Sequence, residues 1–259
     1  MLISSNDLLD FAIEATDGRR GRATDFYFDD EEWRLRYAVT ATGFLFAKQE
    51  ALVKSTYLGA PDLAARKLPV ALTKEELDRA EGPESHPPVS EQRERRARRR
   101  RFEFWPPLML GVPGAAYTPI LAHRQLMAEG AVAQPEAELE ERFAANTEDP
   151  HLRSLREITG YGITATDGEI GSVADALLDP EGWTIRYIVV DTGNWLPGRQ
   201  VAIRPDRVTA IRWDDEDIVV RVRREEVEGA PELSLLEELE RSDAHLALAP
   251  YGTYGGGSA

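Results

Sequence analysis

An internal repeat constrains the fold of this chain more than any other feature. When the sequence is shifted by 150 positions it matches itself without a gap. The recurring residues include Asp17 and Asp167, Asp25 and Asp175, Trp33 and Trp183, Tyr37 and Tyr187, and Gly43 and Gly193. The register still holds where Lys74-Glu75-Glu76 meets Arg224-Glu225-Glu226. Two copies of one unit, Ser5–Asp78 and Leu155–Glu228, should therefore share a strand order.

The second copy predicts six short strands. They are expected at Tyr161–Thr166, Glu169–Leu178, Trp183–Val190, Gln200–Ile203, Arg207–Trp213 and Ile218–Val222. The dipeptide Asp167-Gly168 predicts a tight hairpin, and Asp179–Gly182 predicts a turn. Six short strands at this spacing, without a helical period between them, favour a small antiparallel barrel. We therefore expect a mainly β protein with two small antiparallel barrels related by the repeat.

The residues of the second copy resemble a known family. Thr166–Asp175 (TDGEIGSVAD) and Trp183–Thr192 (WTIRYIVVDT) are similar to the PRC-barrel domain. That domain occurs in the cytoplasmic part of the photosynthetic reaction centre H subunit and in the ribosome maturation factor that assists small-subunit assembly. Asn194–Arg199 (NWLPGR) resembles a stretch of free-standing bacterial proteins with two PRC-barrel copies. The first copy departs from this pattern at Phe44–Lys48, directly after Gly43.

The composition divides the chain into four parts. Residues 1–80 form the first barrel repeat, 81–150 a charged, proline-containing and partly helical connector, 151–230 the second repeat, and 231–259 a tail. In the connector, Ser90 is a plausible N-cap for a helix at Glu91–Phe104. Phe104–Ala122 carries no charge, but its four prolines argue against a continuous membrane-spanning helix. The tail predicts a helix at Leu233–Leu246 and then a glycine-rich end.

Charge and cysteine usage narrow the class of function. The net charge is −15, so the molecule as a whole repels nucleic acid and anionic membranes. The absence of cysteine excludes disulfides, thiolate metal sites and a cysteine nucleophile. The first residues lack the basic and apolar regions of a signal peptide. We expect a cytoplasmic protein, peripheral to the inner membrane if it meets a membrane at all.

No motif predicts a catalytic, metal or cofactor site. Asp191-Thr192-Gly193 resembles the turn of an aspartic protease, but the first copy offers Ala41 in place of the second aspartate. An enzyme whose two aspartates meet in a homodimer is kept as an alternative. Asp214–Asp217 lacks the spacing of a calcium loop, and its counterpart Ala64–Lys67 has the opposite charge, which favours a solvated hairpin. The histidines, which are scattered, are His86, His123, His151 and His245.

Two segments are candidate binding surfaces. The first comprises Asn194, Trp195, Pro197 and Gly198, where an exposed tryptophan beside a rigid turn would suit an interface. The second is the arginine-rich segment of the connector. Its named candidates are Arg98, Arg99, Arg100 and Arg101 with the adjoining Trp105.

The arginine-rich segment is unexpected on so acidic a protein. Residues 91–101 hold seven arginines and two glutamates, a local charge of +5 that leaves −20 for the rest of the chain. Three interpretations stay open: a solvated helix, a contact with anionic lipid or RNA phosphate, and pairing with an acidic partner or a second copy of the chain.

These observations favour a non-enzymatic binding or scaffold protein without a cofactor. Its expected partner is another protein or its own second copy in a homodimer, with possible peripheral contact to an anionic membrane or a membrane complex. The family resemblance implies photosynthetic or electron-transfer complexes as one setting. An RNA–protein assembly factor of the ribosome-maturation type is the alternative, although the acidity of the chain disfavours nucleic acid as a partner.

Overall fold

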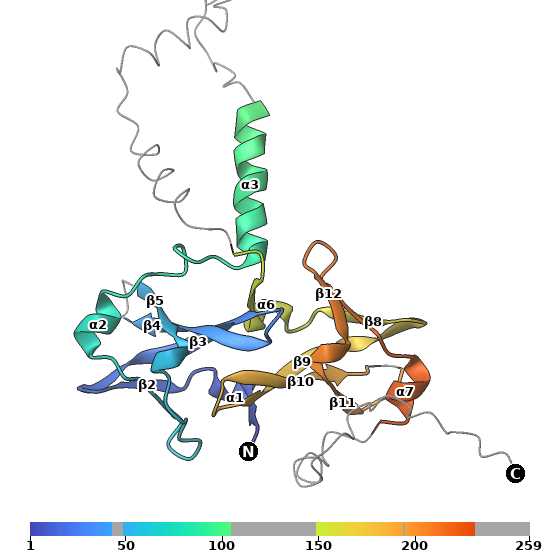
Figure 1. The fold of residues 1–259 in the computed structure, drawn as a ribbon, viewed down its shortest axis with the longest axis horizontal. Coiled ribbons are helices and arrows are strands. Elements are labelled where there is room, and N and C mark those ends of the chain that lie inside the picture. Colours follow the sequence, from blue (N-terminus) through green and yellow to red (C-terminus); the bar gives the residue numbers. More distant parts are fainter. Residues whose placement is uncertain (43–48, 105–148, 194, 231–259) are drawn as a thin grey trace, which may run out of the picture. The chain divides into compact units, whose positions relative to one another are not determined.

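The computed structural model describes residues 1–42, 49–104, 149–193 and 195–230 (Figure 1). Of residues 42, 49 and 98–104 only the backbone is described. The chain divides into two compact units. One contains Met1–Glu84 together with the chain from Pro150 onward, and the other is Ser85–Asp149. Both repeats therefore belong to the same unit.

Apart from β12, the two repeats contain the same elements in the same order. The first comprises β1 (Ile3–Ser4), α1 (Ser5–Leu8), β2 (Ala12–Ala15), β3 (Gly18–Asp29), β4 (Arg34–Thr42), β5 (Gln49–Lys54), η1 (Ser55–Tyr57), β6 (Lys67–Pro69) and α2 (Lys74–Asp78). The second comprises β7 (Leu152–Ser154), α6 (Leu155–Ile158), β8 (Gly162–Ala165), β9 (Gly168–Asp179), β10 (Thr184–Asp191), β11 (Gln200–Ile203), η2 (Pro205–Arg207), β12 (Val208–Arg212), β13 (Asp217–Val220) and α7 (Arg224–Glu228). Where the second repeat has β12, the first has only the isolated bridges Leu58↔Val70 and Asp62↔Lys67, which fall at equivalent positions.

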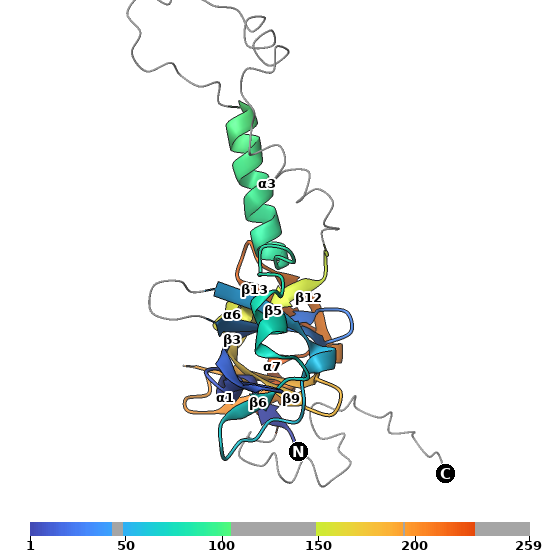
Figure 2. The same cartoon turned by 90° about the vertical axis from the view of Figure 1, so that its left-hand side faces the viewer.

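The fold is mainly β, as predicted, and all six strands predicted in the second repeat are confirmed to within two residues. The strands form one 13-stranded sheet, which curls around its core (Figure 2). Its main path runs in the order β12-β13-β8-β9-β10-β4-β3-β2-β6, and β1, β5, β7 and β11 pair with strands of this path from the side. One feature refines the expected antiparallel pairing. In each repeat one pair of strands is parallel, namely β2 with β6 and β8 with β13. This pairing arises because the sheet curls and brings the last strand of the repeat alongside the strand that follows the arm.

The two repeats join edge to edge at a seam between β4 and β10. Arg34 and Thr184 are paired there, and they occupy the same position in their repeats. Two backbone hydrogen bonds flank this pair, from Leu35 N to Trp183 O at 2.8 Å and from Ile185 N to Trp33 O at 2.7 Å. The two bonds join equivalent residues of the two repeats. The seam therefore has the local twofold symmetry of an interface between two identical subunits.

Each repeat also lends its first segment to the other repeat. We call β1 with α1 (Ile3–Leu8) the first arm, and β7 with α6 (Leu152–Ile158) the second arm. The first arm pairs with β9 of the second repeat, and the second arm pairs with β3 of the first repeat. Figure 1 shows α1 beside the strands of the second repeat and α6 beside β3. The sequence did not predict this exchange.

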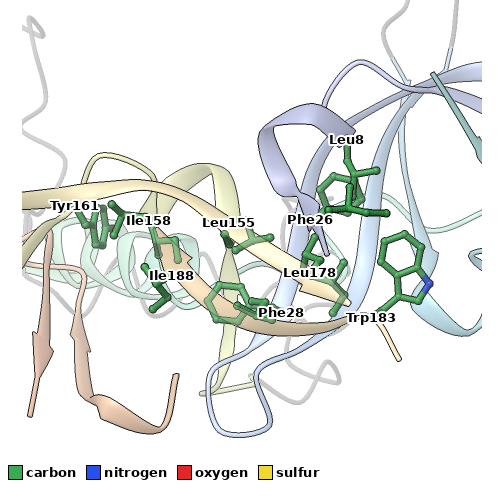
Figure 3. Close-up of a cluster of buried hydrophobic side chains, with 14 of the residues drawn as sticks. Leu8, Phe26, Phe28, Leu155, Ile158, Tyr161, Leu178, Trp183 and Ile188 are labelled. Carbon is green, nitrogen blue, oxygen red and sulfur yellow. The ribbon is translucent and has the colours of Figure 1, made fainter. Parts of the chain in front are cut away.

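One hydrophobic core runs through both repeats. Phe26, Phe28 and Leu8 of the first repeat lie in the same cluster as Leu178 and Trp183 of the second (Figure 3). Trp183 is buried, whereas its counterpart Trp33 is half-buried and packs against the cluster. A smaller cluster on the opposite face of the first-repeat sheet contains Tyr27, Val39, Leu52 and Leu152.

In the connecting unit, α3 (Val89–Phe104) confirms the predicted helix but begins two residues early. Gln92 N donates to Pro88 O at 3.0 Å, so Pro88 occupies the N-cap position and Val89 is the first helical residue. Ser90 therefore lies inside the helix instead of capping it. Residues 105–148, which include all of the uncharged stretch after Phe104, and the predicted helix at Leu233–Leu246 lie outside the described residues.

Candidate functional site

The loop that follows β10 is held by hydrogen bonds within its own repeat. The buried Thr192 hydroxyl lies 2.7 Å from the carbonyl of Leu196 and 2.8 Å from that of Arg199, which closes the loop. Gly193 lies in the left-handed region at φ 55°, where glycine is favoured, and its N–H donates to Asp191 Oδ1 at 2.9 Å. The Asp191 carboxylate is exposed and orders this turn.

Trp195 is not the exposed tryptophan that the sequence suggested. It is half-buried against the core, and the Arg224 guanidinium lies 4.6 Å from the centre of its ring. That distance is typical of a cation–π contact. Arg224 is itself placed by its backbone N–H, which donates to Asp167 Oδ1 at 2.9 Å. The ring thus packs against the core and is covered by Arg224 of its own repeat.

The other residues of this candidate surface differ in their exposure to solvent. Pro197 and Gly198 are exposed, while Asn194 lies outside the described residues. Arg199 turns inward, where Nη1 donates to Glu228 O at 2.7 Å and Nη2 donates to Ala230 O. Because Thr192, Trp195 and Arg199 are all engaged in contacts within the repeat, the exposed residues among those described in the loop are Gly193, Pro197 and Gly198.

The other candidate surface is α3. Arg93 and Arg96 are exposed, and Arg95 forms an ion pair with Glu91 at 3.3 Å. Gln92 is buried, and its Nε2 donates to both Pro87 O and Asp149 O at 2.8 Å, which ties the two ends of the connecting unit together. The side chains of Arg98, Arg99, Arg100 and Arg101, and the whole of Trp105, lie outside the described residues.

Sequence reasoning missed the polar contacts that dock the arms. Ser4 and Ser154 each cap the short helix of their arm, accepting from Asp7 N at 3.1 Å and from Glu157 N at 2.9 Å. Each hydroxyl also donates to an aspartate of the other repeat. Ser4 donates to Asp175, and Ser154 donates to Asp25 Oδ2 at 2.6 Å. The signal was present in the sequence, since both serines and both aspartates recur at the repeat spacing.

Burial changes the acidity of one of these aspartates. Removal of the carboxylate from water raises the pKa of Asp25 to about 6, although hydrogen bonds from Ser154 Oγ and from the backbone N–H groups of Arg156 and Phe26 favour the charged form. A carboxyl group with such a pKa could act in acid–base chemistry. Here its oxygens already accept from the second arm, at 2.6 Å from Ser154 and 3.0 Å from Arg156, so its evident role is to hold that arm.

The second arm has an additional ionic cluster next to it. His151 Nδ1 lies 2.8 Å from Asp30 Oδ1, and Nε2 lies 3.4 Å from Glu31 Oε1. Arg153 Nε donates to Asp30 Oδ2 at 2.6 Å. The hydrogen bond to Asp30 raises the pKa of His151 above its usual range. No pattern in the sequence distinguishes His151 from the other three histidines.

Within the described residues, no group of three or more acidic or histidine side chains is arranged to hold a metal ion. In the acidic hairpin Asp214–Asp217, Asp217 Oδ1 accepts from Thr164 Oγ1 at 2.8 Å, and the other three side chains are exposed. The part of the chain that the structure describes also contains no helix long and apolar enough to cross a membrane.

The comparison with known protein families found a match in the second repeat. No curated protein matches the chain. Residues 150–227 match the family model of the PRC-barrel domain, a range that begins just before the second arm and ends in α7. The resemblance seen in the sequence of the second copy is confirmed over this range, where the chain is similar to the PRC-barrel domain.

Proposed function

We propose that this protein is a non-catalytic scaffold that uses the basic helix α3 to bind anionic lipid headgroups at the inner face of the cytoplasmic membrane. The observation that carries the proposal is the concentration of positive charge on one element. Residues 91–101 carry +5 on a chain whose remaining residues carry −20, and Arg93 and Arg96 are exposed. Arginines near an anionic membrane contribute about 1 kcal/mol each to binding.

The rest of the molecule suits a scaffold. The repeats share a core, and the polar groups that could carry chemistry are engaged in holding the fold: Asp25 and Asp175 dock the arms, and Arg199 binds backbone carbonyls. A rigid body of this kind can position a partner at a membrane without catalysing a reaction. The resemblance to the reaction centre H subunit supports a membrane-bound electron-transfer complex as the setting.

The test is sedimentation of the full-length protein with vesicles of phosphatidylglycerol and phosphatidylcholine, or of phosphatidylcholine alone. We expect binding to the anionic vesicles that weakens as salt is raised, because the Debye length falls to about 8 Å at physiological ionic strength. Replacing Arg93, Arg95 and Arg96 with glutamine should weaken binding by about 3 kcal/mol, roughly a hundredfold.

The matched control removes three exposed arginines outside α3, namely Arg19, Arg212 and Arg221. This variant has the same net charge as the α3 variant and should bind almost like the parent protein. Equal losses in the two variants would show that net charge alone governs binding. No binding of the parent at low salt would exclude the lipid proposal, and tighter binding to RNA of similar charge would favour the assembly-factor alternative.

A further inference from the structure

We infer that the interface between the two repeats also joins two copies of this chain, with the first repeat of each copy bound to the second repeat of the other. This inference concerns the barrels and does not depend on the proposed role of α3. The partner is a second copy of the same chain.

Both repeats contribute an aspartate that accepts hydrogen bonds from the arm of the other repeat. Asp175 accepts from Ser4, from Ser5 Oγ at 2.6 Å and from Asn6 N at 3.1 Å. At the equivalent position Asp25 accepts from Ser154 and Arg156. Neither repeat is complete alone, because each depends on the other for the segment that covers its third strand. A repeat that loses its own partner therefore exposes a surface that only an equivalent repeat can cover.

The covalent path between the repeats does not require them to pair within one chain. They are connected only through Ser85–Asp149, which forms a compact unit of its own. Exchange between two chains keeps every contact of the seam and both arms. Pairing within one chain and pairing between two chains then differ in two ways: in the effective concentration of one repeat around the other, and in the strain on the connecting unit.

One contact in the connecting unit favours pairing within the chain. The Gln92 amide ties Pro87 to Asp149 and so keeps the end of the first repeat close to the start of the second. Exchange between chains would separate or strain these ends. Gln92→Ala should therefore raise the fraction of exchanged dimer by roughly fivefold to tenfold, the effect of losing about one net hydrogen bond.

The seam itself allows the arrangement to be measured. Because the hydrogen bonds of Trp33, Leu35, Trp183 and Ile185 flank the Arg34 and Thr184 pair, these two residues form a non-hydrogen-bonded pair. Their Cα atoms are expected about 4.5 Å apart, a separation that a disulfide can span. The chain has no cysteine, so within a single chain the double variant R34C/T184C can form only this disulfide.

The experiment refolds R34C/T184C at about 0.01 and about 0.5 mM and then oxidises it. Pairing within a chain gives a covalent monomer, and pairing between chains gives a covalent dimer on a non-reducing gel. With an effective concentration on the order of 1 mM, the dimer should rise from roughly 1% to roughly a third of the protein. Adding Gln92→Ala should raise it further at the lower concentration.

The control is D191C/Q200C, which joins β10 to β11 inside the second repeat at a pair with the same hydrogen-bond pattern. It should remain monomeric at both concentrations. The unmodified chain, refolded at the higher concentration and diluted, should show a species of twice the monomer mass by light scattering. The inference is overturned if R34C/T184C stays monomeric and the unmodified chain shows no such species. Dimer in the control at the same level would also overturn it, because the cross-link would then be nonspecific.

Discussion

The first and second arms dock in the same way, but the surfaces that receive them differ. Both arms begin with a short strand, continue into a serine-capped helical turn, and donate a hydroxyl to an aspartate of the other repeat. Around the second arm, Arg153 and His151 bind Asp30. At the equivalent positions around the first arm the chain has Ile3, Met1 and Pro180.

Some contacts of the arms occur in both repeats, and others occur in one repeat only. The shared serine–aspartate contacts belong to the fold, because they occur in both repeats. The Asp30 cluster occurs only beside the arm that follows the connecting unit. The second arm is therefore held partly by Asp25 and lies beside His151, and the pKa of each of these two groups is raised. Among the residues that the structure describes, no histidine lies on or next to the first arm.

The largest expected effect compares the two tryptophans beside the seam. Trp183→Ala should lower the free energy of unfolding by about 3–5 kcal/mol, because it empties part of the shared core. Trp33→Ala removes a half-buried ring and should cost about 1–2 kcal/mol. Urea denaturation of both variants gives the two values. A loss below about 1 kcal/mol for Trp183→Ala would contradict a single core shared by both repeats.

A smaller effect concerns the pH dependence that Asp25 contributes. Its pKa is about 6 in the folded protein and near 3.8 when unperturbed. Between these values the folded state binds the proton that the unfolded state has lost. Stability should therefore fall as pH rises from about 4 to about 6, by on the order of 2–3 kcal/mol, and Asp25 should contribute no further slope above that range.

Asp25→Asn should flatten this part of the profile, as measured by urea denaturation at a series of pH values. The matched control is Asp175→Asn in the other repeat, which should keep the slope because Asp25 is still present. If Asp25→Asn retained the full slope, another group would be responsible for it.

The smallest expected effect is that of His151. Its folded pKa is raised by Asp30, so its contribution to stability is complete below the unfolded value of about 6.5 and is lost as pH rises through the folded pKa. The side chain is 38% exposed, which limits the contribution to about 0–1 kcal/mol. His151→Gln should therefore remove a small slope above about pH 6.5, while His86→Gln should leave it in place. If the pH dependence of stability above about pH 6.5 were unchanged in His151→Gln, His151 would not be the group that causes it.

The strands could be predicted from the sequence because their signals are local. Alternating apolar residues and the Asp167-Gly168 turn identify β8 and β9 whatever the rest of the chain does. The arms could not be predicted in this way, since a strand of two or three residues has no pattern of its own and its partner is chosen by tertiary packing. Trp195 shows the same limit, because Arg224, which covers it, lies 29 positions away in the sequence.

Amide hydrogen exchange of Asp175→Ala tests most directly whether the arms are exchanged between the repeats. Asp175 lies in the second repeat, but its side chain binds residues 4–6 of the first arm. The exchanged arrangement predicts that residues 3–8 exchange faster, because their opening becomes easier by about 1–3 kcal/mol, while residues 152–158 keep their protection. Faster exchange at 152–158 with residues 3–8 unchanged would mean that each arm folds on its own repeat, and would contradict the account.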